Sequence, residues 1–461
     1  MKKIAVLLLC CFSIPSFSQS VTERLNKTIS QLQADSQFKH AIISLYVVDT
    51  QTGKLVFDKN ADIGLAPASC QKIITGATAF ELLGNNYRFK TVVGYHGAIA
   101  GDILNGDLII KGGGDPTLGS WRWAETGDFS ILKKITAAIA AKGIKKINGR
   151  IVCDQENWET NSIPGGWVWE DIGNYYGAGA TGINWHENQY DLILKSGNTV
   201  GDAVIISGTM PSLQDVTLIS ELTTAKKGSG DNAYIYLAPQ SGNGFVRGTI
   251  PAGEDHFTIS GSIPDPAKQF SYELRNTLNE NNIQVITVDL NTSKGVDMET
   301  ILASQSPTLD SMNYWFLKKS INLYGEALLK TMAYEKTKFG STDKGIDLVK
   351  DFWNHHGIET AAINIKDGSG LSPANRITTK SLVTVLQYAK QQNWFASFYN
   401  ALPEINGIRM KDGYIADVRS YCGFIKDKNG NEYTFSFIVN NFDGSASSAR
   451  VKMWQVLDTL K

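Results

Sequence analysis

Residues 66–73 read Ala-Pro-Ala-Ser-Cys-Gln-Lys-Ile and lie between a strand pattern and a helix pattern. A β-rich run over 41–48 and a return run over 54–57 predict a hairpin before this stretch. After it, five apolar residues recur at helix spacing and Gly84 ends the pattern: Ile73, Ile74, Ala77, Phe80 and Leu83. The stretch therefore predicts a hairpin followed by a helix that begins near Pro67-Ala68-Ser69.

Ser69 and Lys72 form a Ser-x-x-Lys pair at this helix entry. Positions i and i+3 share one face of a helix, so the lysine can reach the serine hydroxyl. A lysine with a lowered pKa can remove the hydroxyl proton and make serine a nucleophile. The pattern also occurs at Ser36, Ser130 and Ser341, and in each case a capping serine with a solvated lysine is the alternative. Its setting after a hairpin and before an apolar helix selects Ser69.

Two further short motifs follow in the same chain order. Ser320-Ile321-Asn322 lies within a helical pattern over 312–334 and is expected to begin the helical run 323–334. Lys411-Asp412-Gly413 is expected just before a strand over 418–425. Ser-x-Asn and Lys-x-Gly are weak patterns singly, but Ser-x-x-Lys, Ser-x-Asn and Lys-x-Gly in this order are the signature of penicillin-recognising serine acyl transferases.

With these motifs the chain resembles the D-alanyl-D-alanine carboxypeptidase/endopeptidase family, the class C low-molecular-mass penicillin-binding proteins. The matching segments span nearly the whole chain: 66–73, Gly113-Gly-Asp-Pro-Thr-Leu118, Pro164-Gly-Gly-Trp-Val-Trp-Glu-Asp171, Tyr176-Gly-Ala-Gly179, Lys319-Ser-Ile-Asn322 with Glu326, and Asp367-Gly-Ser-Gly-Leu-Ser372. The resemblance implies a serine-type D-Ala-D-Ala carboxypeptidase that acts on peptidoglycan stem peptides and takes β-lactams as covalent inhibitors, with DD-endopeptidase action left open as a second activity.

The resemblance also implies catalytic roles, which the chemistry of the residues supports. Ser69 would be the nucleophile, and Lys72 its general base, with an ammonium form destabilised by nearby Lys411. Ser320 would relay the proton to the leaving amine. Asn322 would hold the substrate amide and help to fix Lys72.

Substrate binding follows in the same way from the resemblance. The backbone N–H groups of Ser69 and Tyr414 would form the oxyanion hole, and Asp412 and Gly413 would contact substrate. Asp171 matches a carboxylate that would pair with the free amine of a diaminopimelate side chain. A helix cap or surface carboxylate is the alternative for Asp171.

Asp412 departs from the family pattern, which has threonine or serine at the centre of the third motif. That hydroxyl binds the terminal carboxylate of the substrate, whereas two carboxylates in contact repel, by about 1 kcal/mol at 4 Å in water. Three explanations stay open: Asp412 points away, Arg409 or Arg419 supplies the missing charge, or carboxylate recognition is lost.

Composition and charge limit the function classes. The chain has 461 residues, 42% of them hydrophobic, which is enough for a large core. Lys plus Arg number 44 against 45 Asp plus Glu, so no basic excess exists and nucleic acid is excluded as a partner. Scattered histidines and the cysteine spacing match no metal motif, and the serine–lysine chemistry needs no cofactor.

The N-terminus predicts export. A positive Met1-Lys2-Lys3 precedes an apolar stretch over 4–14 and small residues around Phe17, which indicates a signal peptide over 1–18 cleaved after Ser18. An uncleaved anchor and a lipoprotein at Cys10 are weaker readings. After cleavage no apolar run is long enough to span a membrane, and the family resemblance points to the periplasm. Cys70, Cys153 and Cys422 remain, and we interpret them as packing residues.

The pattern of elements predicts an interrupted domain of the α/β (α+β) class. Residues 19–90 and 265–461 are expected to form a serine transpeptidase/β-lactamase-like domain, with an antiparallel sheet flanked by helices. Residues 91–264 are expected to form a β-rich insert, with room for a nested subdomain. Two function classes stay open: the DD-peptidase, with a hydrolase of another acyl compound as its variant, and a non-catalytic cell-wall-binding protein in which Asp412 marks the loss of activity.

Overall fold

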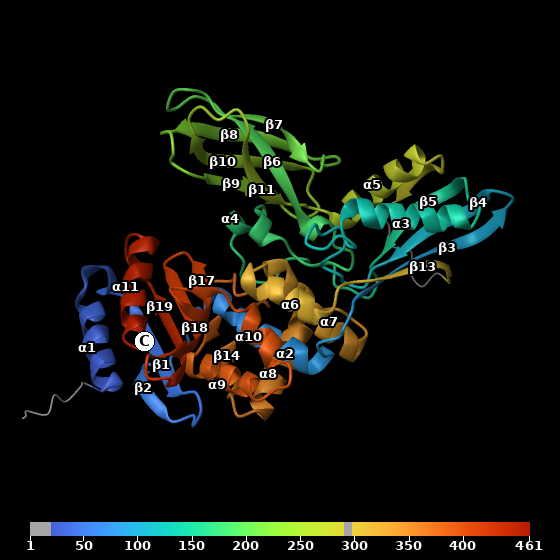
Figure 1. The fold of residues 1–461 in the computed structure, drawn as a ribbon. Helices are drawn as coiled ribbons and strands as arrows, with labels where there is room; N and C mark the ends of the chain where they lie inside the picture. Colours follow the sequence, from blue (N-terminus) through green and yellow to red (C-terminus); the bar gives the residue numbers. More distant parts are fainter. Residues whose placement is uncertain (1–19, 290–296) are drawn as a thin grey trace, which may run out of the picture.

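The computed structural model describes residues 20–289 and 297–461. The expected signal peptide over 1–18 lies outside the described residues. Figure 1 shows one larger body that contains both ends of the described chain and two smaller bodies above it. No helix in the described part of the chain is long and apolar enough to cross a membrane.

The larger body is built around a six-stranded antiparallel sheet of order β16-β17-β18-β19-β1-β2. Its strands come from the two ends of the chain: β1 (Ile42–Asp49), β2 (Leu55–Lys59), β16 (Glu404–Ile405), β17 (Ile408–Ile415), β18 (Val418–Lys426) and β19 (Glu432–Asn440). Strand β1 pairs with β19 from Ile42 opposite Asn440 to Asp49 opposite Tyr433. The first and last segments of the chain therefore fold as one unit.

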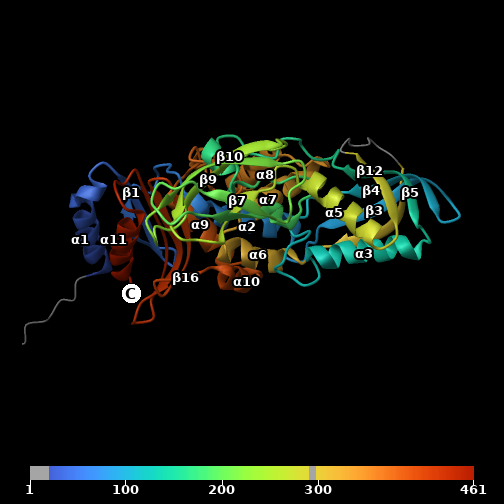
Figure 2. The same ribbon diagram turned by 90° about the horizontal axis from the view of Figure 1, so that it is seen from above.

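Helices cover both faces of this sheet. On one face, α1 (Val21–Ala34) and α11 (Ala446–Asp458) pack side by side, and Leu25, Ile29 and Met453 are buried against strand residues such as Phe437. The other face carries the larger helical layer, as the turned view also shows (Figure 2). Its helices are α2 (Lys72–Leu83), α6 (Leu309–Lys318), α7 (Asn322–Thr337), α8 (Thr342–His355), α9 (Thr379–Lys390) and α10 (Phe395–Ala401). The predicted antiparallel sheet flanked by helices is confirmed.

The core of the helical layer follows the apolar pattern read from the sequence. Ile73, Ile74, Ala77 and Phe80 of α2 are buried among residues of α6, α7 and α9. Gly84 follows α2 with φ +85°, a conformation that favours glycine, so the helix ends where the sequence predicts. The short strands β14 (Ile363–Asn364) and β15 (Arg376–Ile377) bury Ile363 and Ile377 in the same core.

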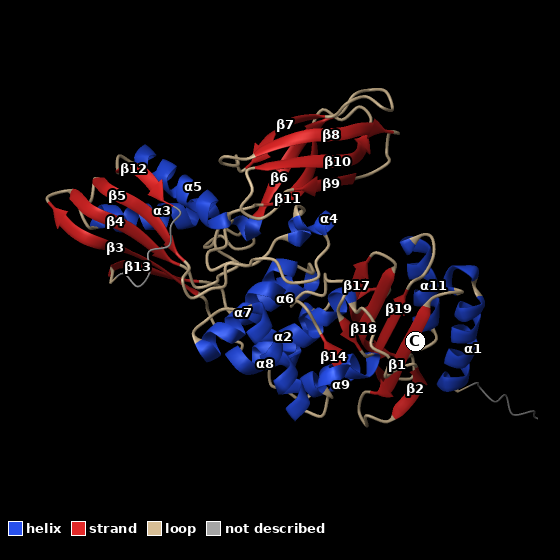
Figure 3. Cartoon of the chain, turned by 180° about the vertical axis from the view of Figure 1, so that it is seen from behind, coloured by secondary structure: helices blue, strands red, loops and turns tan. Residues whose placement is uncertain are grey.

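A second body contains a five-stranded sheet of order β12-β5-β4-β3-β13. It comprises β3 (Lys90–Ala100), β4 (Ile103–Lys111), β5 (Lys146–Asp154), β12 (Gln284–Asp289) and β13 (Glu299–Gln305), with the helices α3 (Asp128–Ala141) and α5 (Pro266–Glu280). Phe270, Leu274 and Leu278 of α5 are buried in the same core as Ile151 of β5. Figure 3 shows both helices lying along this sheet.

This second body corrects the expected boundary at residue 264. The return of helical patterns after about residue 267 suggested that the catalytic domain resumes there. In the structure, α5 packs on the five-stranded sheet, and β13 pairs with β3 through Gln305 opposite Lys90. The amphipathic pattern of α5 identifies a helix but carries no information on the sheet that covers it. We propose that the insert extends over about 90–305.

A third body lies within the insert and is almost entirely β-structure. It has two three-stranded sheets, of orders β11-β6-β7 and β8-β10-β9. Their strands are β6 (Gln189–Lys195), β7 (Ile205–Met210), β8 (Thr217–Ala225), β9 (Asn232–Tyr236), β10 (Asn243–Pro251) and β11 (Phe257–Ser262). They share one buried core that includes Leu192, Ile235 and Val246. The short helix α4 (Trp169–Ile172) lies between this body and the larger one (Figure 1).

One local expectation at the motifs is wrong: the helical pattern over 312–334 is interrupted between α6 and α7, where Ser320 takes a positive φ of 58°. Lys411-Asp412-Gly413 precedes the expected strand over 418–425, which is β18, and the motif itself lies inside a further strand, β17, that sequence analysis did not identify. The apolar periodicity continues across the break at Ser320, so the sequence predicts one uninterrupted helix there. The sequence of β17 does not alternate clearly between apolar and polar residues, so it does not predict a strand. Sequence analysis also did not identify α1 and α10.

Candidate active site

Ser69 lies in a 3-10 turn, η2 (Ala68–Gln71), directly before α2. The preceding residue, Ala68, has φ +46°, which is a left-handed conformation that a side chain disfavours. Strain of this kind costs about 1–3 kcal/mol and persists only where the surroundings impose it. Gly370 is pressed against the carbonyl of Ala68 so closely that a Cβ there would lie 1.9 Å from the oxygen. The surrounding fold thus fixes the turn that presents Ser69.

Lys72 begins α2, one turn after Ser69, and its side chain is completely buried. Its Nζ lies 3.0 Å from Ser69 Oγ, 2.6 Å from Asn322 Oδ1 and 2.6 Å from the carbonyl oxygen of Ser369. The amide of Asn322 is oriented by its Nδ2, which donates to the carbonyl of Tyr176 at 2.7 Å. Two partners of Nζ are therefore acceptors, while the third is a hydroxyl that can also donate. A neutral Lys72 can donate to both acceptors and direct its lone pair at the Ser69 hydroxyl.

The surroundings of Lys72 favour this neutral form. Burial, and after it the charge of nearby Lys411, lowers the pKa of Lys72 to about 7 against the opposing charges of three carboxylates: Asp367, Glu326 and Asp412. Burial penalises the charged form of a lysine, and a like charge adds to the penalty. Near neutral pH a large share of Lys72 is thus able to accept a proton.

Asp367 and Glu326 lie under Lys72 and hold the segment that supplies the Ser369 carbonyl. Asp367 accepts hydrogen bonds from the N–H groups of Gly370 at 2.8 Å and Ser372 at 2.7 Å, and from Trp167 Nε1 at 2.8 Å. Glu326 accepts from Gly368 N at 3.0 Å, and its pKa is raised to about 8 by burial and by the charge of Asp367. Sequence analysis noted this segment only as a family marker. Its backbone carbonyl carries no side-chain signal that could have identified it.

Lys411, Asp412 and Gly413 reach the site from β17. The third of these, Gly413, lies against η2, where a Cβ would be 2.8 Å from the backbone nitrogen of Ser69. The buried Lys411 directs its Nζ to Asp412, 2.6 Å from the carbonyl oxygen and 3.1 Å from Oδ1. Burial raises the pKa of Asp412, but the charges of Lys411 and Arg419 outweigh it and hold the pKa below its usual range. Asp412 is therefore ionised at neutral pH.

The two arginines that were considered as a source of positive charge in place of the missing hydroxyl have different partners. Arg409 pairs with Glu404 at 3.5 Å and donates to the carbonyl of Leu402, toward β16. Arg419 lies opposite Tyr414 in the β17–β18 pairing, and its guanidinium is 4.9 Å from the centre of the Tyr414 ring. Only Arg419 contributes to the low pKa of Asp412.

A cleft of about 610 Å³ opens above Ser69. Ser320, Asn322 and Tyr414 line it from the larger body, and Asp171 and Tyr176 line it from the insert. Burial raises the pKa of Asp171 to about 6, against a hydrogen bond from Tyr176 that lowers it. The structure thus brings the predicted residues Ser69, Lys72, Asn322, Lys411 and Gly413 into one cluster, and it places Ser320, Asp171 and Tyr414 around the same cleft.

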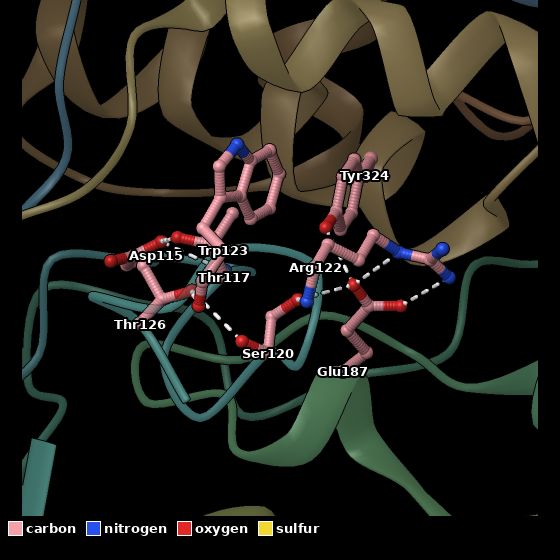
Figure 4. Close-up of polar contacts among 8 residues, drawn as sticks. All are labelled: Asp115, Thr117, Ser120, Arg122, Trp123, Thr126, Glu187 and Tyr324. Carbon is pink, nitrogen blue, oxygen red and sulfur yellow. Dashed lines mark hydrogen bonds and ion pairs between the residues drawn. The ribbon is translucent and has the colours of Figure 1, made fainter. Parts of the chain in front are cut away.

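A buried polar network joins the insert to the helix that carries Asn322 (Figure 4). Glu187 is fully buried and accepts from Arg122 at 2.7 and 3.0 Å, from Ser120 Oγ at 2.7 Å and from Tyr324 Oη at 2.7 Å. Arg122 also lines the cleft, and Tyr324 lies in the first turn of α7, two residues after Asn322. Sequence analysis missed this network because its members come from three distant segments.

Within residues 20–289 and 297–461, no group of three or more His, Cys, Asp or Glu side chains could hold a metal ion. Cys70, Cys153 and Cys422 are buried and free, in agreement with their interpretation as packing residues. Cys70 also lies beside the site, with its Sγ 3.4 Å from the carbonyl oxygen of Lys411.

Comparison with known proteins gives consistent matches along the chain. Residues 25–460 match the D-Ala-D-Ala carboxypeptidase 3 (S13) family. The chain is 25% identical over 459 residues to a D-alanyl-D-alanine carboxypeptidase of Actinomadura sp. (strain R39), covering 92% of this chain and 82% of that protein. It is 21% identical over 466 residues to the D-alanyl-D-alanine carboxypeptidase DacB of Haemophilus influenzae, covering 97% and 93%.

The fold is also similar to a solved structure. The crystal structure of penicillin-binding protein 4 (dacB) from Haemophilus influenzae superposes with a TM-score of 0.78 and 20% sequence identity. The match covers 90% of this chain and 94% of that structure. All three bodies of the molecule therefore belong to one shared architecture.

Proposed function

The chain belongs to the D-Ala-D-Ala carboxypeptidase 3 (S13) family, and from this premise we propose that Ser69 is the residue that forms its acyl-enzyme. Its activity is that of a serine-type DD-peptidase, a hydrolase that acts on peptidoglycan. The assignment of Ser69 rests mainly on one observation. Lys72 Nζ lies 3.0 Å from Ser69 Oγ, and its two other hydrogen-bond partners are both acceptors. A buried lysine held in this way can act as the base that activates a serine.

Acylation begins when Ser69 Oγ attacks the carbonyl carbon of the penultimate D-alanine. Lys72 accepts the Ser69 proton as the new C–O bond forms. The oxyanion of the tetrahedral intermediate is held by the N–H groups of Ser69 and Tyr414, each worth about 10²–10³ in rate. The C–N bond then breaks, and the proton that Lys72 took from Ser69 is relayed through the Ser320 hydroxyl to the leaving amine. Water hydrolyses the acyl-enzyme in the second half of the reaction and restores Ser69.

The acyl part of the substrate is a peptidoglycan stem peptide. Support comes from Asp171, which faces the cleft from the insert and is ionised above a pKa of about 6. A carboxylate in that position would pair with the free amine of a diaminopimelate side chain. Gly413 packs closely against the turn that carries Ser69. This position allows the backbone of β17 to bind an extended peptide substrate by main-chain hydrogen bonds.

We propose the periplasm as the compartment, because the peptidoglycan on which this activity acts lies outside the cytoplasmic membrane. Support comes from the N-terminal sequence, in which a positive start and a short apolar stretch precede small residues. β-Lactams are the expected covalent inhibitors, and the Haemophilus influenzae penicillin-binding protein 4 structure is also described as complexed with a β-lactam.

Intact-mass measurement with benzylpenicillin tests the assignment. We expect one penicillin adduct on the wild-type protein and none on Ser69→Ala. Ser36→Ala is the matched control, because Ser36 begins another Ser-x-x-Lys sequence but is exposed on the turn η1 (Ser36–Phe38). It should keep the adduct.

The same variants should be assayed for D-alanine release from an acyl-D-Ala-D-Ala peptide. Adduct and turnover that persist in Ser69→Ala would contradict the nucleophile assignment. A wild-type protein with neither adduct nor turnover would favour the non-catalytic wall-binding alternative.

A further inference from the structure

Asp412 lies next to the nucleophile turn on a strand that borders it directly. β17 pairs with β16 at Ile408 and Arg409, and Met410 N donates to the carbonyl of Pro403. From Lys411 onward, one edge of the strand faces η2 and the other pairs with β18. Contacts with η2 are close at both ends of the motif. Cys70 Sγ lies 3.4 Å from the Lys411 carbonyl, and Gly413 packs on Ser69 N. Asp412 is held between these two contacts.

The cleft extends along β17 in one direction only. Tyr414, Ile415 and Ala416 line it, together with residues of the insert, whereas Lys411 and Asp412 do not. The longer, acyl part of a peptide substrate needs the open part of the cleft over Tyr414 to Ala416. The single residue that leaves after cleavage must then extend past Ser69 toward Lys411 and Asp412, where the cleft ends.

The charges at this end do not favour a second carboxylate. Lys411 directs its Nζ to the carbonyl and carboxylate oxygens of Asp412, so its charge is already paired. The Asp412 side chain keeps 39% exposure, so its carboxylate remains accessible to a ligand. Arg419 lies on the neighbouring strand β18, where it covers the Tyr414 ring and donates a 3.3 Å hydrogen bond to Tyr421 Oη.

We propose that Asp412 makes this peptidase selective for a leaving residue whose carboxyl group is an amide, over one that ends in a free carboxylate. An ionised carboxylate only accepts hydrogen bonds, so it can bind the NH₂ of an amide but repels another carboxylate. The reaction is otherwise unchanged: the Ser69 ester forms, the C–N bond breaks, and a D-amino acid amide leaves with the proton from Ser320. This inference rests on the proposed function and adds the chemistry of the leaving residue.

Two peptides that differ only at the terminus test the inference: acyl-D-Ala-D-Ala and acyl-D-Ala-D-alaninamide. The measurement is kcat/KM for each peptide and the ratio between them. Asp412 also raises the pKa of Lys72, so its replacement affects the base in the same way for both substrates. The ratio cancels that effect and isolates recognition of the terminus.

Wild-type protein should cleave the amide with the higher kcat/KM. Asp412→Asn, which removes the charge, and Asp412→Thr, which adds a hydroxyl, should each shift the ratio toward the free carboxylate by about tenfold or more. Asp417→Asn is the matched control, because Asp417 is an exposed carboxylate in the turn of the same hairpin and takes φ +53°, which asparagine tolerates. It should leave the ratio unchanged.

Two results would overturn the inference. One is a wild-type preference for the free carboxylate, and the other is the same ratio in wild type, Asp412→Asn and Asp412→Thr. If a wild-type preference for the free carboxylate disappears in Arg419→Gln, the residue that binds the terminal carboxylate is Arg419. If neither peptide is cleaved and Ser69 takes no penicillin, the proposed function fails and this inference fails with it.

Discussion

Lys72 illustrates how single residues at this site depend on what surrounds them. Its three partners are the hydroxyl of Ser69, the amide oxygen of Asn322 and a backbone carbonyl at Ser369. An ammonium group could donate to all three, but a neutral amine can donate to only two and then accept from the third. The lowered pKa of about 7 therefore sets both the charge of Lys72 and the direction of its hydrogen bond with Ser69.

This pKa predicts how acylation depends on pH. Below pH 7 Lys72 is increasingly protonated and cannot accept the Ser69 proton, so the rate should fall about tenfold for each further pH unit. Above pH 7 the rate should level off. The second-order rate of acylation by benzylpenicillin, measured from pH 5 to 9, checks this. A profile without an acid limb, or a rate that still rises tenfold per unit up to pH 9 as the ordinary lysine pKa of 10.5 would give, would rule out a Lys72 that is neutral at pH 7.

At the scale of elements, the site depends on how closely β17 approaches η2. Gly413 provides this approach, because its missing side chain leaves room for Ser69 N and the Cβ of Ala68. Ser420 Oγ of β18 donates to the Pro67 carbonyl at 2.5 Å and holds the turn from the other side. The proposed oxyanion donors on Ser69 and Tyr414 come from these two elements, so their separation depends on this packing.

Gly413→Ala should therefore damage catalysis more than stability alone explains. The added Cβ would lie 2.4 Å from Ser420 Oγ, 2.8 Å from Ser69 N and 2.9 Å from Ala68 Cβ, so both the Ser420 side chain and η2 must move away from β17. We expect benzylpenicillin acylation to fall by about 10²-fold, the effect of one lost oxyanion donor. Gly165→Ala is the control, because a Cβ there meets nothing within 4 Å. Equal acylation rates in the two variants would show that this contact does not position the oxyanion donors.

At the scale of the whole molecule, the insert is bound into the larger body by buried charges. Glu187, Arg122 and Tyr324 form one contact (Figure 4). Lys330 of α7 forms another, with Nζ 3.2 Å from Glu159 and 2.8 Å from the Ala180 carbonyl. Both contacts reach α7, the helix that also carries Asn322. The insert therefore supplies one wall of the cleft and also helps to position the helix behind Lys72.

Glu187→Gln should destabilise this junction. The substitution leaves the Arg122 charge without its carboxylate in a buried site, which costs about 3–5 kcal/mol. Calorimetry should show a lower unfolding midpoint, and acylation should slow because Tyr324 follows Asn322 closely in α7. Asp102→Asn is the control: it breaks the exposed Lys145–Asp102 pair at 3.5 Å and should cost less than about 1 kcal/mol. Equal midpoints for the two variants would exclude a stabilising role for Glu187.

The sequence by itself determined the features that depend on neighbouring residues. The hairpin before residue 66, the helix that ends at Gly84 and the pairing of Ser69 with Lys72 follow from turn residues and from the 3.6-residue period of a helix. The order of the three motifs was enough to indicate the family and the antiparallel sheet flanked by helices. The sequence showed that Asp412 departs from the third motif of the family, but it did not show how Asp412 affects recognition of the substrate terminus.

Tertiary structure alone decided the features that join distant segments. It placed α5 and β13 with the insert, and it put Lys411-Asp412-Gly413 inside a strand against η2. It also brought the Ser369 carbonyl to Lys72 across 297 positions of sequence. The physical reason is that periodicity reports which face of an element is apolar, and not which element covers that face. Backbone groups such as this carbonyl are the same in every residue, so only the fold can select one of them.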